Sequence, residues 1–120
     1  MKAELLRALV LRELDESKAR EVTALDVRTL TSIADYLIIC CGTSSRHCKS
    51  IAQHVAQQAR LAGVQLLGLE GEREGDWILV DLADVIVHVM QRQTRDYYQL
   101  EKLWDPDWGQ TAGKIEPIQS

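Results

Sequence analysis

Valine recurs at every second position of the stretch DVIVHVM, residues 84–90, and the positions between the valines are mixed in character. Successive side chains of a β-strand point to opposite faces of a sheet, so the alternation predicts a strand. One face of this strand would carry the three valines, Val85, Val87 and Val89. The other face would carry Asp84, Ile86, His88 and Met90. The valine face is typical of a core, whereas the mixed face raises the question of what it contacts.

Four further segments are expected to form strands, namely residues 22–28, 36–41, 64–70 and 76–82. Residues 36–41 are apolar at every position, which is typical of a central strand covered on both faces. The last three strands are joined by tight connections, so they are predicted to pair in antiparallel fashion.

Apolar residues recur every three or four positions in two segments, residues 2–15 and the stretch that follows GTSS at 42–45. This spacing predicts amphipathic helices, the first ending near residues 15–18. Thr43 or Ser44 is the expected N-cap of the second helix, and Gly63 can take the left-handed conformation that ends it.

A third helix is predicted over residues 91–104. One side of this helix would carry Tyr97, Leu100, Leu103 and Trp104, and Asp105-Pro106 would end it. Residues 105–120 show no periodicity, so we expect a flexible tail after a domain of residues 1–104. The order of segments predicts a single α/β (α+β) domain with a mixed sheet of about five strands flanked by helices.

Composition narrows the class of protein. The 120 residues fit one domain and are 46% hydrophobic and 27% charged, as in ordinary globular proteins. No apolar run approaches the roughly 20 residues that span a bilayer, and the charged N-terminus is unlike a signal peptide, so we expect a cytoplasmic protein without membrane contact. Cys40, Cys41 and Cys48 are interpreted as reduced core thiols, which suits a reducing compartment.

The charge of the chain is negative and uneven. A formal net charge of −4 argues against nucleic acid as the main partner, because phosphate binding depends on clustered Lys and Arg. Residues 70–84 contain six acidic residues and one arginine. Such a run is usually a solvated surface, but it could also steer a basic protein partner.

Candidate chemistry is sparse. Asp84 and His88 are separated by about 13 Å along a strand, at roughly 3.3 Å per residue, so they cannot share a proton or a metal ion. His47 and His54 lie two helical turns apart, which is also too far for one ion. No Ser, Cys or Lys has a base at a recognisable spacing. We therefore predict no metal site, no cofactor and no catalytic residue.

One alternative involves the GTSS segment. A strand-to-helix junction resembles a phosphate-binding corner, so a nucleotide-dependent transferase is a rival hypothesis. The acidic pair that would hold magnesium in such an enzyme is not apparent, however. A scaffold acting by self-association is a second rival. A docking surface is the alternative that involves no chemistry, and in it Trp77 and Asp81 would lie beside His88 and Met90. The simpler interpretation is that Trp77 and Met90 are core residues.

The motifs ALDVR (24–28), DYLIICCGTSSRH (35–47), EGEREGDWILVDLADVIVHVMQ (70–91) and RDYYQLEKLW (95–104) resemble the Iojap family of ribosomal silencing factors, known in bacteria as RsfS. The resemblance covers roughly residues 5–104. It implies a fold similar to that of nucleotidyltransferases, without enzymatic activity.

The resemblance also implies a function. Members of the family bind the large ribosomal subunit through ribosomal protein L-fourteen, block its association with the small subunit, and so repress translation when nutrients are scarce. Little direct contact with nucleic acid is expected, and some homodimer formation through the first helix. The implied partner-binding positions are Trp77, Asp81, Asp84, His88, Met90, Arg95 and Tyr98, with Glu101 and Trp104 completing the motif.

Overall fold

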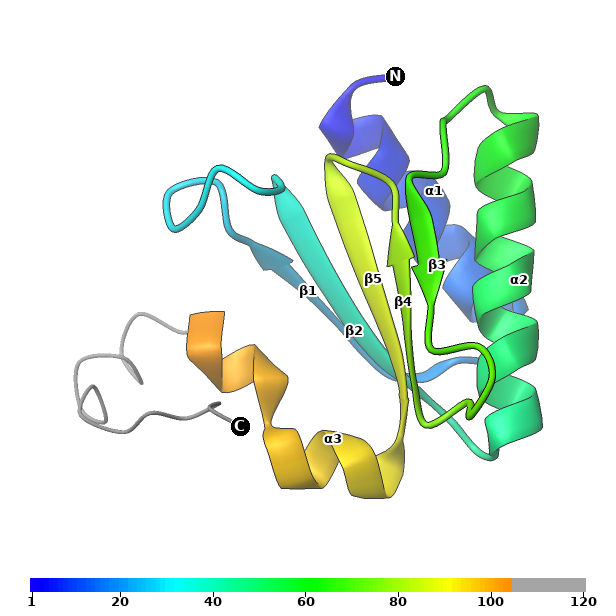
Figure 1. The fold of residues 1–120 in the computed structure, drawn as a ribbon. Helices are drawn as coiled ribbons and strands as arrows, with labels where there is room; N and C mark the ends of the chain where they lie inside the picture. Colours follow the sequence, from blue (N-terminus) through cyan, green and yellow to red (C-terminus); the bar gives the residue numbers. More distant parts are fainter. Residues whose placement is uncertain (105–120) are drawn as a thin grey trace.

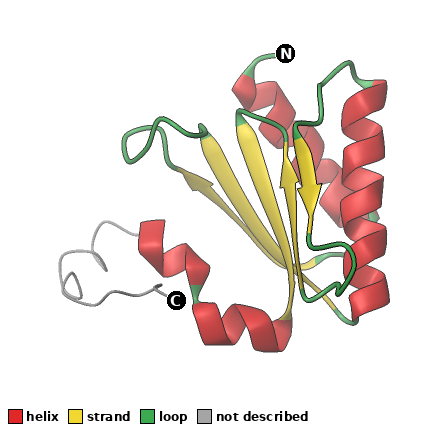
Figure 2. Cartoon of the chain, viewed as in Figure 1, coloured by secondary structure: helices red, strands yellow, loops and turns green. Residues whose placement is uncertain are grey.

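The computed structural model describes residues 1–104, apart from the side chain of Trp104. The elements in chain order are α1 (Ala3–Glu16), β1 (Arg20–Asp26), β2 (Tyr36–Gly42), α2 (Ser45–Leu61), β3 (Gly68–Glu70), β4 (Trp77–Asp81), β5 (Val85–Gln91), α3 (Arg92–Tyr98) and the 3-10 helix η1 (Leu100–Trp104) (Figures 1 and 2). The predicted order of helices and strands is confirmed. The tail at 105–120, predicted to be flexible, lies outside the described residues.

The five strands form one mixed sheet in the order β1-β2-β5-β4-β3. Strands β2 and β5 are parallel, whereas the other neighbouring pairs are antiparallel. The prediction of a mixed five-stranded sheet is therefore confirmed. Strand β2 lies between β1 and β5, and all seven of its residues are buried, as expected for a central strand.

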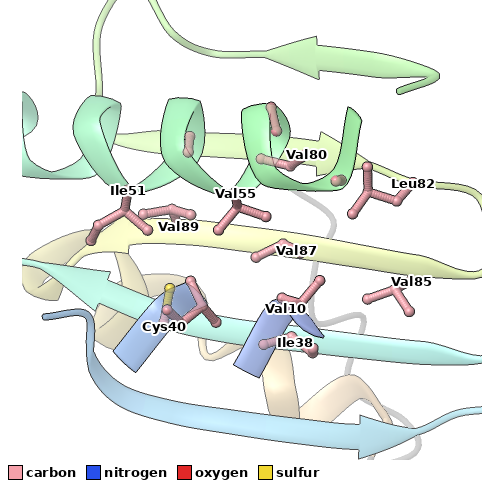
Figure 3. Close-up of a cluster of buried hydrophobic side chains, with 14 of the residues drawn as sticks. Val10, Ile38, Cys40, Ile51, Val55, Val80, Leu82, Val85, Val87 and Val89 are labelled. Carbon is pink, nitrogen blue, oxygen red and sulfur yellow. The ribbon is translucent and has the colours of Figure 1, made fainter. Parts of the chain in front are cut away.

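The valine face of β5 is the core face. Helices α1 and α2 cover this side of the sheet, and α3 lies on the other side (Figure 1). Val85, Val87 and Val89 are fully buried, and they pack in one cluster with Ile51 and Val55 of α2 (Figure 3). Burial of this apolar area stabilises the helical layer against the sheet.

The predicted ends of α2 are present. The Ser44 hydroxyl accepts a hydrogen bond from the His47 backbone N–H at 3.0 Å, which caps the first turn. Gly63 follows the helix with φ +86°, a conformation that L-residues rarely adopt. Within residues 1–104, no helix has both the length and the apolar character needed to cross a bilayer.

Three predicted boundaries are wrong. The strand expected over residues 22–28 begins and ends two residues earlier, at Arg20–Asp26. The third strand was expected over residues 64–70, but β3 contains only Gly68–Glu70. Gly68 pairs with Asp81, the last residue of β4, so residues 64–66 have no strand beside them.

The expected continuous helix at 91–104 breaks at Gln99, which has a left-handed conformation with φ +49°. Tyr97 is consequently 80% exposed, whereas Leu100 packs against the sheet, so these side chains do not share one side.

Candidate functional site

Three of the residues predicted from the motif meet on the face of the sheet opposite α1 and α2. The indole N–H of Trp77 in β4 donates to Nδ1 of His88 in β5 at 2.8 Å. The Trp77 ring also packs against Tyr98 of α3, with centroids 5.0 Å apart and planes at 49°. We call Trp77, His88 and Tyr98 the aromatic cluster. The structure thus brings together residues that are up to 21 positions apart in the sequence.

Burial determines the protonation state of His88. The residue is only 8% exposed, and desolvation of the ring lowers its pKa to about 4. The imidazole is therefore neutral at pH 7. Because an indole N–H can only donate, Nδ1 is the unprotonated nitrogen and the proton resides on Nε2. His88 acts here as a neutral hydrogen-bond acceptor that orients the Trp77 ring.

The predicted residues in and beneath the aromatic cluster differ in solvent exposure. Tyr98 is 39% exposed and Trp77 is half-buried, so both present area to a partner. Met90 is completely buried in a small core with Leu37 and Ile39, against which Trp77 and Leu100 of η1 pack. In the folded chain Met90 therefore supports the surface from below and contributes no exposed area.

Arg95 joins α3 to the edge of the sheet. Its side chain is 6% exposed and donates to the Glu21 carbonyl, to Thr23 Oγ1 at 3.0 Å and to Glu101 Oε2 at 3.2 Å. One guanidinium NH also lies 3.5 Å from Cys41 Sγ. The planar guanidinium can satisfy several acceptors at once, which a lysine cannot do. Arg95 therefore positions α3, and through α3 it positions Tyr98.

An apolar hollow of about 230 Å³ opens beside the aromatic cluster. Its floor comes from the sheet, and its rims come from the β1–β2 loop and from η1. The main lining residues are Ile33, Leu37, Leu79, Ile86, Leu100 and Leu103, together with His88. Ile33 is 72% exposed, so the rim is apolar as well. We call this feature the apolar hollow.

Two residues of the apolar hollow, Leu79 and Ile33, were missed in the sequence for different reasons. Leu79 lies between Trp77 and Asp81 on the same strand face, so alternation could have found it. Ile33 lies in a loop without periodicity, and no local signal distinguishes it from an ordinary exposed residue.

The two predicted aspartates lie apart from the aromatic cluster. Asp81 ends β4, four residues from Trp77, and its Oδ1 accepts from the Ala83 backbone N–H at 2.9 Å. Asp84 lies in the β4–β5 turn, where its carbonyl accepts from the backbone N–H groups of Asp35 and Tyr36. Asp84 therefore anchors the turn to the start of β2 through its main chain, and its exposed side chain lies far along the sheet from Tyr98.

The GTSS corner is closed by its own hydrogen bonds. The Thr43 backbone N–H donates to Nδ1 of His47 at 2.9 Å, and Nε2 of His47 lies 2.9 Å from the Ser17 carbonyl. Ser44 already caps the helix. Several donors of this corner therefore have partners within the chain. Among residues 1–104, no three His, Cys, Asp or Glu side chains are placed to hold a metal ion.

Comparison with known proteins relates the chain as a whole to a family. Residues 2–119 match the family model described as "Ribosomal silencing factor during starvation". The chain is 45% identical over 95 residues to the ribosomal silencing factor RsfS of Haemophilus influenzae, an alignment covering 79% of this chain and 93% of that protein.

A more distant relative is a mouse protein named "Mitochondrial assembly of ribosomal large subunit protein 1", which is 30% identical over 94 residues. This alignment covers 76% of the chain and 41% of the mouse protein. Among solved structures, a Chromobacterium violaceum protein is similar with a TM-score of 0.85 and 38% identity, covering 87% of each chain.

Proposed function

Because this chain belongs to the RsfS family of ribosomal silencing factors, we propose that it binds the large ribosomal subunit through ribosomal protein L-fourteen and so blocks association with the small subunit. A large subunit that cannot join its partner cannot translate, so the effect is repression of translation under nutrient limitation. The name of the mouse relative supports the large subunit as the partner. The action we propose is steric, takes place in the cytoplasm and involves no catalysis.

The observation that carries this proposal is the aromatic cluster. Trp and Tyr are the side chains that most often anchor protein interfaces, because they bury a large rigid area at a small entropic cost. Trp77 and Tyr98 pack against each other at the surface with tilted rings. The apolar hollow beside them can accept an aliphatic side chain of the partner. We assign Met90 and Arg95 a supporting role, since both are buried.

The acidic residues supply charge complementarity to a basic partner. Glu70 ends the edge strand β3, and Glu72 and Glu74 follow it. Asp81 lies on the same strand face as Trp77. Opposite charges raise the rate of encounter more than they strengthen buried contacts. Added salt should therefore slow association with the subunit and change dissociation little.

The test is sedimentation of a cell lysate that contains the tagged protein on a sucrose gradient. We expect the protein to migrate with free large subunits and to be absent from free small subunits. Tyr98→Ala should shift the protein toward the top of the gradient. Leu61→Ala serves as a matched control, because Leu61 is an exposed apolar residue of α2 on the other side of the sheet. Recovery of the unaltered protein only in the top fractions would contradict the proposal.

We include some self-association through α1 in the proposal, because Leu5 of this helix is 61% exposed. Sedimentation velocity over a range of protein concentrations measures it. If Leu5→Ala leaves the dissociation constant of the dimer unchanged, the contact between the two copies does not involve this part of α1.

A further inference from the structure

A second cleft lies at the C-terminal ends of the parallel strands β2 and β5, away from the apolar hollow. Its volume is about 390 Å³, within the size range of small-molecule sites. Arg20 and Glu21 of β1 form one wall. Gly42 ends β2 and Thr43 follows it, and Gln91 and Arg92 join β5 to α3. None of these residues belongs to the aromatic cluster.

The position of the cleft follows from the topology of the sheet. Strands β2 and β5 are parallel neighbours. The chain leaves β2 for α2 on one side of the sheet, and it leaves β5 for α3 on the other side (Figure 1). Two connections that diverge in this way leave a crevice beyond the carboxyl ends of the strands. Open α/β sheets characteristically bind ligands at such a point.

The lining of the cleft favours an anion with several oxygens. Arg20 and Arg92, whose side chains end in guanidinium groups, both line the cleft. Arg20 forms no ion pair within residues 1–104. A guanidinium presents its N–H groups as a planar fork, which matches the oxygens of a phosphate and binds them with charge-assisted hydrogen bonds.

Glu21 shows how the cleft already holds an anionic group. Its backbone is left-handed with φ +50°, a conformation that costs energy for a residue with a Cβ. In this conformation the Glu21 carbonyl accepts a hydrogen bond from the Arg95 guanidinium. The Glu21 carboxylate forms an ion pair with Arg92. Asp96 also forms an ion pair with Arg92, with 3.2 Å between Asp96 Oδ1 and Arg92 Nε. An external phosphate can therefore compete with the Glu21 carboxylate for the Arg92 guanidinium.

We propose that this cleft binds the phosphate group of a small phosphate-bearing molecule, held by Arg20 and Arg92. The site is independent of the large-subunit function proposed above and involves no chemical step. Arg92 also begins α3, the helix that carries Tyr98. A bound ligand would thus contact the element that presents the aromatic cluster.

Titration of the full-length protein with pyrophosphate, followed by backbone amide NMR signals, tests the proposal. We expect saturable shifts at Gly42, Thr43 and Gln91, and no comparable shifts in sodium chloride at matched ionic strength. Arg20→Gln and Arg92→Gln should each weaken binding by about tenfold, because each removes a charge-assisted fork. Both arginines are exposed, so the fold should survive these changes.

Glu21→Gln gives the sharpest result, because it should strengthen pyrophosphate binding by several-fold through loss of the competing carboxylate. Arg60→Gln, which removes an exposed arginine near the end of α2, is the matched control and should leave the affinity unchanged. A parallel titration with adenosine diphosphate shows whether a nucleoside adds affinity. Binding that is as tight as that of pyrophosphate, or tighter, supports the phosphate site. Linear, non-saturable shifts, or equal losses in the Arg60 and Arg92 variants, would overturn the proposal.

Discussion

Trp77 and His88 share a hydrogen bond of 2.8 Å although they are not opposite each other in the sheet. Trp77 is paired with Met90, and His88 is paired with Leu79, so the bond runs diagonally between β4 and β5. The ring centroids lie 5.9 Å apart at 52°. This contact explains the histidine on the mixed face of β5, because it fixes the tilt of an indole ring that Tyr98 then packs against.

Removal of the acceptor should destabilise the fold. His88→Ala leaves the half-buried Trp77 N–H without its partner, and we expect the free energy of unfolding to fall by about 1–3 kcal/mol. Urea denaturation measures this loss. In a double-mutant cycle with Trp77→Phe, which removes the donor, the combined loss should be smaller than the sum of the two single losses. Fully additive losses would mean that the hydrogen bond contributes nothing.

Stability should depend on pH through His88. Burial lowers the pKa of this residue to about 4 in the folded protein, whereas an unperturbed histidine of the unfolded chain has a pKa of 6.5. Between these values the unfolded state binds more protons, so the free energy of unfolding decreases as the pH falls from about 6.5 to about 4. A pKa difference of one unit between the folded and unfolded states corresponds to about 1.4 kcal/mol in the free energy of unfolding. The loss attributable to His88 is therefore on the order of 3 kcal/mol.

The control for this pH dependence is His88→Gln, which keeps an acceptor for the indole N–H but cannot titrate. Thermal midpoints of both proteins between pH 7 and pH 4 should diverge, with the unaltered protein falling more steeply. Parallel curves would assign the acid sensitivity to other groups.

Met90 and Tyr98 should respond to truncation in opposite ways. Met90→Ala leaves a cavity in a completely buried site, so we expect a loss of about 2–5 kcal/mol of stability. Tyr98→Ala removes a side chain that is 39% exposed, so the fold should survive. Its cost should appear in large-subunit binding, at about 1–4 kcal/mol, or about 5-fold to nearly 1000-fold in affinity.

Measuring thermal midpoint and subunit affinity on the same preparations separates these two roles. Trp77→Ala should lower both quantities, since the indole is half-buried and bonded to His88. If Tyr98→Ala binds the subunit normally, the docking surface does not include the aromatic cluster.

Arg95 should control the attachment of α3. Arg95→Met removes every polar contact of the guanidinium with β1 and η1, and it leaves Glu101 without its ion-pair partner. We expect hydrogen exchange at 92–104 to accelerate strongly while exchange in β2 and β5 changes little. Arg95→Lys should restore protection only in part, because one ammonium cannot reach all the acceptors. Uniform acceleration across the chain would indicate a global effect instead.

The local pattern was sufficient for much of the architecture. Alternation placed Val85, Val87 and Val89 on the core face, and spacing of three and four residues identified α1 and α2. Of the two predicted N-cap candidates, Thr43 and Ser44, the structure selects Ser44, and Gly63 follows the end of α2 as predicted. These features depend on backbone geometry within a few residues, so local spacing is enough to predict them.

The second face of the sheet was decided only by tertiary structure. The alternation of β5 could not show that Met90 is buried while Tyr98 is exposed, because both depend on where α3 lies. That position depends on Arg95, which bonds to Glu21 and Thr23 more than 70 residues earlier in the chain. The bend at Gln99 then directs Leu100 into the apolar hollow. Contacts between distant segments, and not local spacing, determine which side chains a partner can reach.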